Sequence, residues 1–289
     1  MLEVKRCGYG EKIEYPCTLV LGAFDGLHTG HRALLAAAKG AGLPVVVTTL
    51  LGGKGKSLFT REERAFLFSR AGVGGVYEID FTEEMKNTAA EAFAAQLFGN
   101  VNAKWVYCGE DFRFGKGASG TPALLENYAP VTVIKSVQSG GEKVATSVCK
   151  KLVEARDFDG LRTLLGEEGY FIGGVVEHGR EVGRTYGFPT LNLSLPPEKL
   201  LPPDGVYGGF AETPEGRFQS ILNIGARPTF GVEEKKLEAH LIGFSGDLYG
   251  AAVRVIPTVF LRPVSRFASK EALEEQLRKD ISAVQGGRK

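Results

Sequence analysis

Two patterns of hydrophobic and polar positions divide the chain. The first half alternates short apolar runs with stretches of helical periodicity, which predicts parallel strands separated by helices. From Tyr170 onward the pattern changes to short strands broken by Gly and Pro, which predicts a small antiparallel barrel or sandwich. We therefore predict an α/β protein with two domains, residues 1–165 and residues 166–289.

The individual elements follow from the same pattern. The strands predicted in the first domain are 17–22, 43–50, 75–79, 105–108 and 131–137. The helices predicted there are 29–39, 61–71 and 87–98, and one further helix over 153–165 leads into the linker. The strands predicted in the second domain are 171–176, 205–211, 219–224, 237–244 and 254–261, followed by a helix over 270–284 with Ser269 as its N-cap.

Composition narrows the class of protein. The 289 residues carry a net charge of +1, which gives no general attraction to nucleic acid or membrane. No apolar run reaches the roughly 18 residues of a membrane helix, and the N-terminus lacks the apolar core of a signal peptide. The four cysteines form no CxxC pair, which predicts reduced, buried thiols. We expect a cytoplasmic monomer or weak homo-oligomer that binds neither nucleic acid nor membrane.

The stretch GAFDGLHTGH, residues 22–31, connects a predicted buried strand to a predicted helix. Free backbone N–H groups and the helix dipole at such a junction favour a phosphate group, and Gly30 lets a ligand approach the backbone. His28 and His31 share a face of the helical turn, so both imidazoles can donate hydrogen bonds to phosphate oxygens during transfer. The stretch predicts a site for nucleotide transfer.

This stretch resembles the HxGH nucleotidyltransferases, and its first five residues resemble the FMN adenylyltransferase module of bifunctional riboflavin kinase/FAD synthetase. A second stretch, CGEDFRFGKG over residues 108–117, is similar to the G-x-D-F-R-F-G loop of that family. The resemblance implies a Rossmann-like nucleotidyltransferase domain in which His28 and His31 are catalytic. The residues it implies at the nucleotide are Gly22, Phe24, Asp25 and Gly30, and those at the flavin are Asp111, Phe112 and Arg113.

Three features of the first domain depart from that family. The place of its Phe-x-Pro-His-Pro stretch reads TTLLGGK, residues 48–54, and the glycine-rich loop carries no Arg near Ala118. Its phosphate-binding Ser-Ser-Thr-x-Ile-Arg motif corresponds to ATSVCK over residues 145–150. There Thr146 and Ser147 keep hydroxyls, whereas Lys150 keeps the charge of the arginine without its bidentate fork. We expect ATP to bind differently or more weakly in this domain.

A glycine-rich basic segment opens the second domain, over residues 173–192. The glycines that recur in it are Gly179, Gly183 and Gly187. Backbone N–H groups of such a loop can surround phosphates while Arg180 or Arg184 adds positive charge. Pro189 fixes a turn that leaves Thr190 and Asn192 on one side of an extended segment, and their oxygens suit Mg²⁺.

The whole segment resembles riboflavin kinase, and the likeness extends over residues 171–282. It implies that Thr190 and Asn192 bind Mg²⁺ and ATP, and that residues 179–187 form a flap over the nucleotide. It also implies that Glu238, in the string EAHL, is the general base. The signature NIGARPT precedes it at residues 223–229, and Arg262 leads into a C-terminal helix that borders the flavin.

The sequence therefore predicts an enzyme that phosphorylates riboflavin with ATP to FMN and then adenylylates FMN to FAD. Its partners would be riboflavin, FMN and ATP with Mg²⁺. Three alternatives stay open at this point: a riboflavin kinase whose first domain is inactive or regulatory, a non-catalytic flavin-binding protein, and a first domain that transfers another nucleotide such as CMP.

Overall fold

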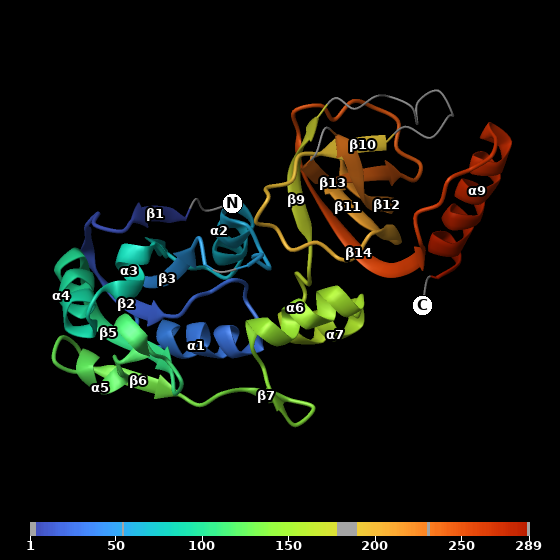
Figure 1. Cartoon of the computed structure of the whole chain (residues 1–289). Helices are drawn as coiled ribbons and strands as arrows, with labels where there is room; N and C mark the ends of the chain where they lie inside the picture. The colour runs from blue at the N-terminus through green and yellow to red at the C-terminus, as the bar shows by residue number, and fades with distance from the viewer. Residues whose placement is uncertain (1–3, 54, 178–189, 230–231, 288–289) are drawn as a thin grey trace. The chain divides into compact units, whose positions relative to one another are not determined.

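The computed structural model describes residues 4–53, 55–177, 190–229 and 232–287. The chain forms two compact units, residues 1–148 and residues 149–289, and helix α6 (Thr146–Ala155) begins at the end of the first (Figure 1). In the described part of the chain no helix is long and apolar enough to cross a membrane. The four cysteines are buried and free, as predicted: Cys7, Cys17, Cys108 and Cys149.

The first unit is built on a six-stranded parallel sheet in the order β1-β4-β3-β2-β5-β6. Its strands are β1 (Lys5–Gly8), β2 (Ile13–Leu21), β3 (Val45–Leu51), β4 (Gly75–Asp80), β5 (Val101–Gly109) and β6 (Val131–Ile134). Its helices are α1 (Thr29–Lys39), α2 (Arg61–Arg70), α3 (Glu83–Asn87), α4 (Ala90–Asn100) and α5 (Pro122–Leu125), with the short 3₁₀ helix η1 (Lys116–Ala118). A small hairpin follows β6, made of β7 (Gln138–Ser139) and β8 (Glu142–Lys143).

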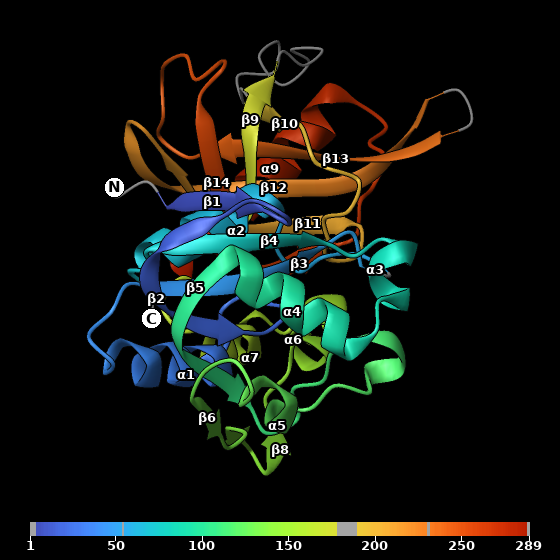
Figure 2. The same ribbon diagram turned by 90° about the vertical axis from the view of Figure 1, so that its left-hand side faces the viewer.

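The connections of this sheet reverse direction beside β2. From β2 the chain passes through α1 to β3 and through α2 to β4, and it then returns through α4 to β5 on the other side of β2. Because such crossovers are right-handed, α4 covers the face opposite to α1 and α2, and Figure 2 looks onto that α4 face. A crevice at the carboxyl ends of the strands is expected where the strand order reverses.

The segment between the two units corrects one prediction. A single helix was expected over residues 153–165, but the structure has α6 ending at Ala155 and α7 (Phe158–Leu165) beginning after a break. Arg156 takes a left-handed conformation, with φ of 62°, and this ends α6. Asp157 then caps α7, because its Oδ1 accepts a hydrogen bond of 2.8 Å from the N–H of Gly160.

The second unit is a closed antiparallel barrel of six strands in the order β10-β13-β12-β11-β14-β9. Its strands are β9 (Ile172–Glu177), β10 (Thr190–Leu193), β11 (Gly205–Thr213), β12 (Gly216–Thr229), β13 (Val232–Leu241) and β14 (Ala252–Arg262). Leu222, Ile224, Leu237 and Ala239 fill the interior with no exposed surface, so the residues between them face outward. The predicted parallel-sheet domain and antiparallel barrel are both confirmed.

The C-terminal helix α9 (Lys270–Gly286) packs against the outer face of the barrel at β11 and β12 (Figure 1). Ser269 caps it as predicted, with its hydroxyl accepting from the N–H of Ala272 at 3.2 Å. The fit is close, since a Cβ built on Gly208 would lie 2.7 Å from the side chain of Val284. The outer face of these two strands is therefore covered in part by a helix rather than by solvent.

Candidate active sites

The loop that joins β2 to α1 holds the two histidines. Gly26 has a φ of 151°, which favours glycine, and a Cβ there would lie 2.9 Å from the ring of Phe59. The turn delivers His28 to the N-cap of α1, where its Nδ1 accepts a hydrogen bond of 3.2 Å from the N–H of His31. The sequence predicted this helix over the residues that the structure gives, and it placed both histidines at its start.

The two imidazoles stack on each other with ring centroids 3.7 Å apart, and Phe24 packs on the other face of His31 at 4.4 Å. The Nδ1 of His31 donates to the carbonyl oxygen of Gly26 at 2.7 Å, since a carbonyl only accepts. The Nδ1 of His28 is an acceptor, so the proton of its neutral ring lies on Nε2. The pair therefore presents one N–H donor and one lone pair in its neutral state.

Burial keeps both rings neutral. It lowers the pKa of His28 to about 4, and it lowers the pKa of His31 further, with the neighbouring His28 adding to the effect. A phosphate group brought against the rings would act in the opposite direction, because a nearby negative charge favours the protonated form. The site is thus set to gain a proton only when it holds an anion.

A cavity of ≈ 630 Å³ opens at the carboxyl ends of the parallel strands. The residues that line it from the strand ends are Leu21, Thr48, Leu50, Ile79, Gly109 and Ile134. His28, Gly30 and His31 line it from the start of α1, and Gly22 lines it from the loop after β2. This is the crevice expected beside β2, where an open parallel sheet binds its ligands.

The predicted flavin loop forms another wall of this cavity. Asp111, Phe112 and Arg113 all line it, and Phe112 packs on Phe114 with ring centroids 5.7 Å apart. The guanidinium of Arg113 donates to the carbonyl oxygens of Glu110 and Phe112, at 3.3 and 2.8 Å. An apolar aromatic surface beside a cation is suited to a flat ring that carries a phosphate.

Lys143, which the sequence motifs do not include, faces Asp111 from the β7–β8 hairpin. The two side chains form an ion pair, and the hydrogen bond from Lys143 lowers the pKa of Asp111. Lys143 also lines the cavity and so adds positive charge to it. The sequence held a signal for this hairpin in Gly140 and Gly141, which both take positive φ at its tip.

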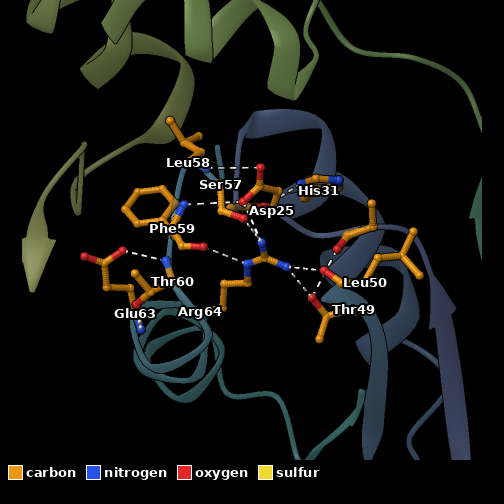
Figure 3. Close-up of polar contacts among 12 residues, drawn as sticks. Asp25, His31, Thr49, Leu50, Ser57, Leu58, Phe59, Thr60, Glu63 and Arg64 are labelled. Atoms are coloured by element: carbon orange, nitrogen blue, oxygen red, sulfur yellow. Dashed lines mark hydrogen bonds and ion pairs between the residues drawn. The ribbon is translucent and has the colours of Figure 1, made fainter. Parts of the chain in front are cut away.

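Asp25 and Phe24 do not line the cavity. The carboxylate of Asp25 pairs with Arg64 of α2 at 2.7 Å, and it also accepts from the backbone N–H groups of Leu58 and Phe59 at 3.1 and 3.4 Å (Figure 3). Arg64 donates as well to the carbonyl oxygens of Phe59 and Leu50, at 2.9 and 2.6 Å. Asp25 thus fastens the histidine loop to α2, a role that the sequence did not reveal.

The predicted phosphate-binding motif at the start of α6 meets the cavity through its first two residues, Ala145 and Thr146. Thr146 lines it, whereas Ser147 is exposed and neither Ser147 nor Lys150 is part of the lining. Thr48 begins the stretch that stands in place of Phe-x-Pro-His-Pro, and its hydroxyl bonds both the N–H and the carbonyl of Gly22 at 3.1 and 3.0 Å. Of the side chains predicted to bind phosphate over residues 145–150, only that of Thr146 therefore lines the cavity.

The second unit brings three predicted residues together on the outer face of the barrel. Asn192 of β10 lies directly opposite Glu238 of β13, and Thr190 lies opposite His240 on the same face. Directly opposed side chains in an antiparallel pair have Cβ atoms about 5 Å apart. Of the predicted flap, Gly179, Gly183, Arg184 and Gly187 lie outside the described residues.

The donor set at this face fits magnesium. A hydroxyl and an amide oxygen are hard oxygen ligands, and Mg²⁺ characteristically takes few protein ligands and completes its shell with phosphates and waters. Among the described residues no group of three His, Cys, Asp or Glu is placed to hold a metal on its own. The residues that would hold Mg²⁺ are therefore Thr190 and Asn192, in company with a nucleotide.

Arg262 fastens α9 to the end of β14. Its guanidinium donates to both carboxylate oxygens of Asp280, with an ion-pair distance of 2.8 Å, and Asp280 is only 4% exposed. Gln276 donates to the same carboxylate at 2.9 Å, and the ring of Phe267 lies 5.5 Å from the guanidinium carbon. In this structure the predicted flavin residue Arg262 holds the helix that was expected to border the flavin.

Family models for two enzymes match the chain, FAD synthetase over residues 10–148 and riboflavin kinase over residues 165–286. The bifunctional riboflavin kinase/FMN adenylyltransferase of Bacillus subtilis (strain 168) is 31% identical over 283 residues, which cover 91% of this chain and 89% of that protein. The chain belongs to the bifunctional riboflavin kinase/FMN adenylyltransferase family.

Other members of the bifunctional family agree. The riboflavin kinase/FMN adenylyltransferase of Escherichia coli (strain K12) is 32% identical over 287 residues, covering 91% of this chain and 90% of that protein. A solved structure described as a macrolide-efflux protein from Streptococcus pneumoniae matches the fold over 99% of this chain and 100% of its own, with a TM-score of 0.85 and 27% identity. That description differs from the names of the curated relatives, and the likeness supports the two-unit fold.

Proposed function

We propose that this chain makes both flavin nucleotides. The second unit transfers the γ-phosphoryl group of ATP to the terminal ribityl hydroxyl of riboflavin, giving FMN and ADP. The first unit joins the phosphate of FMN to the α-phosphorus of a second ATP, giving FAD and pyrophosphate. Two observations, one in each unit, carry the proposal: Glu238 lies directly opposite Asn192 in the second unit, and the first unit has its own histidine-lined cavity.

In the kinase reaction Glu238 is the group placed to take the proton of the attacking hydroxyl. A carboxylate is a weak base, so the contribution of Glu238 depends on its position. Phosphoryl transfer is catalysed chiefly by alignment and by charge stabilisation around the phosphoryl oxygens. Mg²⁺, when bound, supplies that charge, and Thr190 and Asn192 fix the side of Glu238 on which the phosphates lie.

In the adenylyl transfer the histidine pair stabilises the phosphates. His28 donates from Nε2 in its neutral state, because its Nδ1 accepts from the backbone of α1. His31 donates from Nε2 only after it gains a proton, because its Nδ1 is committed to Gly26. Charge that develops on the α-phosphate or the leaving pyrophosphate favours the uptake of a proton from solvent by His31, so the stabilisation grows as the transfer proceeds.

We propose that FAD formation by the first unit is slower than FMN formation by the second unit. The motif that should bind the ATP phosphates covers residues 145–150, and of these only Ala145 and Thr146 line the cavity. The arginine of that motif is replaced by Lys150. The same observation favours a second candidate, a riboflavin kinase whose first unit binds a nucleotide without transferring it. A third candidate is a first unit that transfers a nucleotide with another base, such as cytosine, in place of adenine.

Two single substitutions test the assignment, with each serving as the control for the other. Glu238→Gln should abolish FMN formation from riboflavin while FAD formation from added FMN continues. His28→Asn should abolish FAD formation from FMN while FMN formation continues. Chromatography of riboflavin, FMN and FAD over time measures both. Full FMN formation by Glu238→Gln would refute the kinase assignment, and unchanged FAD formation by His28→Asn would refute the first site.

We also propose a cellular compartment and an oligomeric state for this enzyme. Four buried, free cysteines fit a reducing compartment, so we place the enzyme in the cytoplasm as a monomer or weak homo-oligomer. Size-exclusion chromatography with light scattering at several concentrations measures the oligomeric state. A stable oligomer that persists on dilution would contradict the proposal.

A further inference from the structure

One residue beside Glu238 has a buried side-chain atom with no hydrogen-bond partner among the described residues. The side-chain oxygen of Asn223, on β12, is buried and accepts no hydrogen bond from the described residues. Two other buried side-chain oxygens in the described part of the chain share this property, those of Thr18 and Ser220. Thr18 lies within the parallel sheet, and Ser220 points into the barrel in line with Leu222 and Ile224.

Asn223 differs from those two in what it faces. It lies directly opposite Glu238 in the β12–β13 pair, on the outer face of the barrel. Since Asn192 lies opposite Glu238 on the other side, the three residues form one row across β10, β13 and β12. The row continues through Val206 of β11 to Arg262 of β14, whose side chain is bound to α9.

The order of the residues in this row indicates on which side of Glu238 each substrate binds. The residues proposed for Mg²⁺ and ATP lie on the β10 side of Glu238, and the helix α9 lies over β11 and β12 on the other side. In an in-line phosphoryl transfer the attacking oxygen and the leaving oxygen lie on opposite sides of the phosphorus. The alcohol therefore approaches from the β12 side, and the next polar group it meets beyond Glu238, about one strand spacing of 4.8 Å away, is Asn223.

We propose that the amide oxygen of Asn223 accepts a hydrogen bond from a hydroxyl of the ribityl chain of riboflavin and so positions the terminal hydroxyl at Glu238. The proposal rests on the kinase function proposed above. A carboxylate has no hydrogen to give when ionised, so Glu238 cannot satisfy the amide oxygen. A polyol chain brings several hydroxyl donors to this place, and one of them would satisfy an acceptor that is buried without a donor in the part of the chain that the structure describes.

A substitution that removes this oxygen should separate substrate binding from folding. Asn223→Ala removes a buried acceptor that has no donor in the described structure, so the unfolding midpoint should stay the same or rise. Riboflavin should bind about tenfold more weakly, the loss expected for one hydrogen bond, and kcat/KM for riboflavin should fall by the same factor while KM for ATP stays unchanged. Ser220→Ala is the matched control: it removes an equally buried oxygen on the same strand, but one that faces the interior, and riboflavin affinity should not change.

The probe is the full-length protein titrated with riboflavin, and in parallel with lumiflavin, which has the ring system without the ribityl chain. Asn223→Ala should weaken riboflavin and leave lumiflavin unchanged. Equal weakening of both flavins, or no weakening of either, would overturn the assignment to the ribityl chain. Unchanged riboflavin affinity with a lowered kcat and a shifted pH profile would also overturn it, because Asn223 would then act by orienting Glu238. If the unaltered protein bound riboflavin but made no FMN, the kinase proposal would fail while the titrations would still decide the role of Asn223.

Discussion

Replacing Arg64 by Met should unfold the first unit at a much lower denaturant concentration. Arg64 and Asp25 are 5% and 13% exposed, and their ion pair is 2.7 Å long (Figure 3). Methionine keeps most of the length and apolar surface of the side chain, so the change removes only the charge and the five N–H donors of the guanidinium. What remains is a carboxylate in a mostly buried position without its counter-charge.

The size of the loss follows from the contacts. Removing one partner of a buried ion pair costs about 3–5 kcal/mol, because the other charge stays buried and unpaired. Asp25 keeps the backbone N–H groups of Leu58 and Phe59, at 3.1 and 3.4 Å, so the lower end of that range applies, about 3 kcal/mol. Asp25→Asn in the same chain removes the stranded charge, so the double variant should be less destabilised than the sum of the two single ones.

The chain provides its own reporter for this experiment. It holds a single tryptophan, Trp105, which lies on β5 of the first unit, so its fluorescence during urea unfolding follows that unit. FMN formation follows the second unit in the same samples and should stay unchanged. Glu62→Gln on the same helix is the matched control, since Glu62 is 72% exposed in its pair with Arg6 and should change stability by less than about 0.5 kcal/mol.

Two results would refute this reasoning. An unfolding midpoint for Arg64→Met equal to that of Glu62→Gln would show that the pair with Asp25 contributes little. Additive losses in the double variant would show that the two side chains act separately rather than as a pair.

Three further substitutions or conditions follow from the sites. Folded His28 has a pKa of about 4 against 6.5 in the unfolded chain, so the unfolded state binds the proton first as pH falls below 6.5, and His28 alone should cost the first unit about 2 kcal/mol between pH 7.5 and pH 5. The lowered pKa of His31 should add to this loss, and urea unfolding of His28→Asn should show a smaller total loss. Lys143→Met should raise KM for ATP in FAD formation about three- to tenfold and leave FMN formation unchanged, because it uncovers the charge of Asp111 in the cavity; steady-state kinetics with an unaltered KM would contradict this. Asp280→Asn should weaken the ion pair that binds Arg262 to α9, and it should raise KM for riboflavin without changing KM for ATP. Hydrogen exchange in α9 as slow as in the unaltered protein would contradict this prediction.

The sequence predicted the elements whose signals are local. The helix over residues 29–39 follows from an N-cap and a glycine stop, and the structure has it at the same residues. Ser269 was recognised as a cap for the same reason. The break at Arg156 was missed because a non-glycine residue in the left-handed region leaves no mark in the hydrophobic pattern, and the residues around it are helical on both sides.

Contacts between distant residues escaped prediction for a different reason. Asp25 and Arg64 are 39 positions apart and meet only because α1 and α2 cover the same face of the sheet. Asp25 was therefore assigned to the nucleotide, although its carboxylate is already held by α2. The row Asn192, Glu238 and Asn223 depends on the register of three strands, which no single stretch of sequence contains.

The measurement that tests the account most directly is a time course of the purified protein with riboflavin, ATP and Mg²⁺, in which riboflavin, FMN and FAD are separated at each time. We expect FMN to form first and accumulate, and FAD to follow more slowly. Riboflavin that stays bound but is converted to neither product would contradict it, and the chain would then be a flavin-binding protein rather than an enzyme.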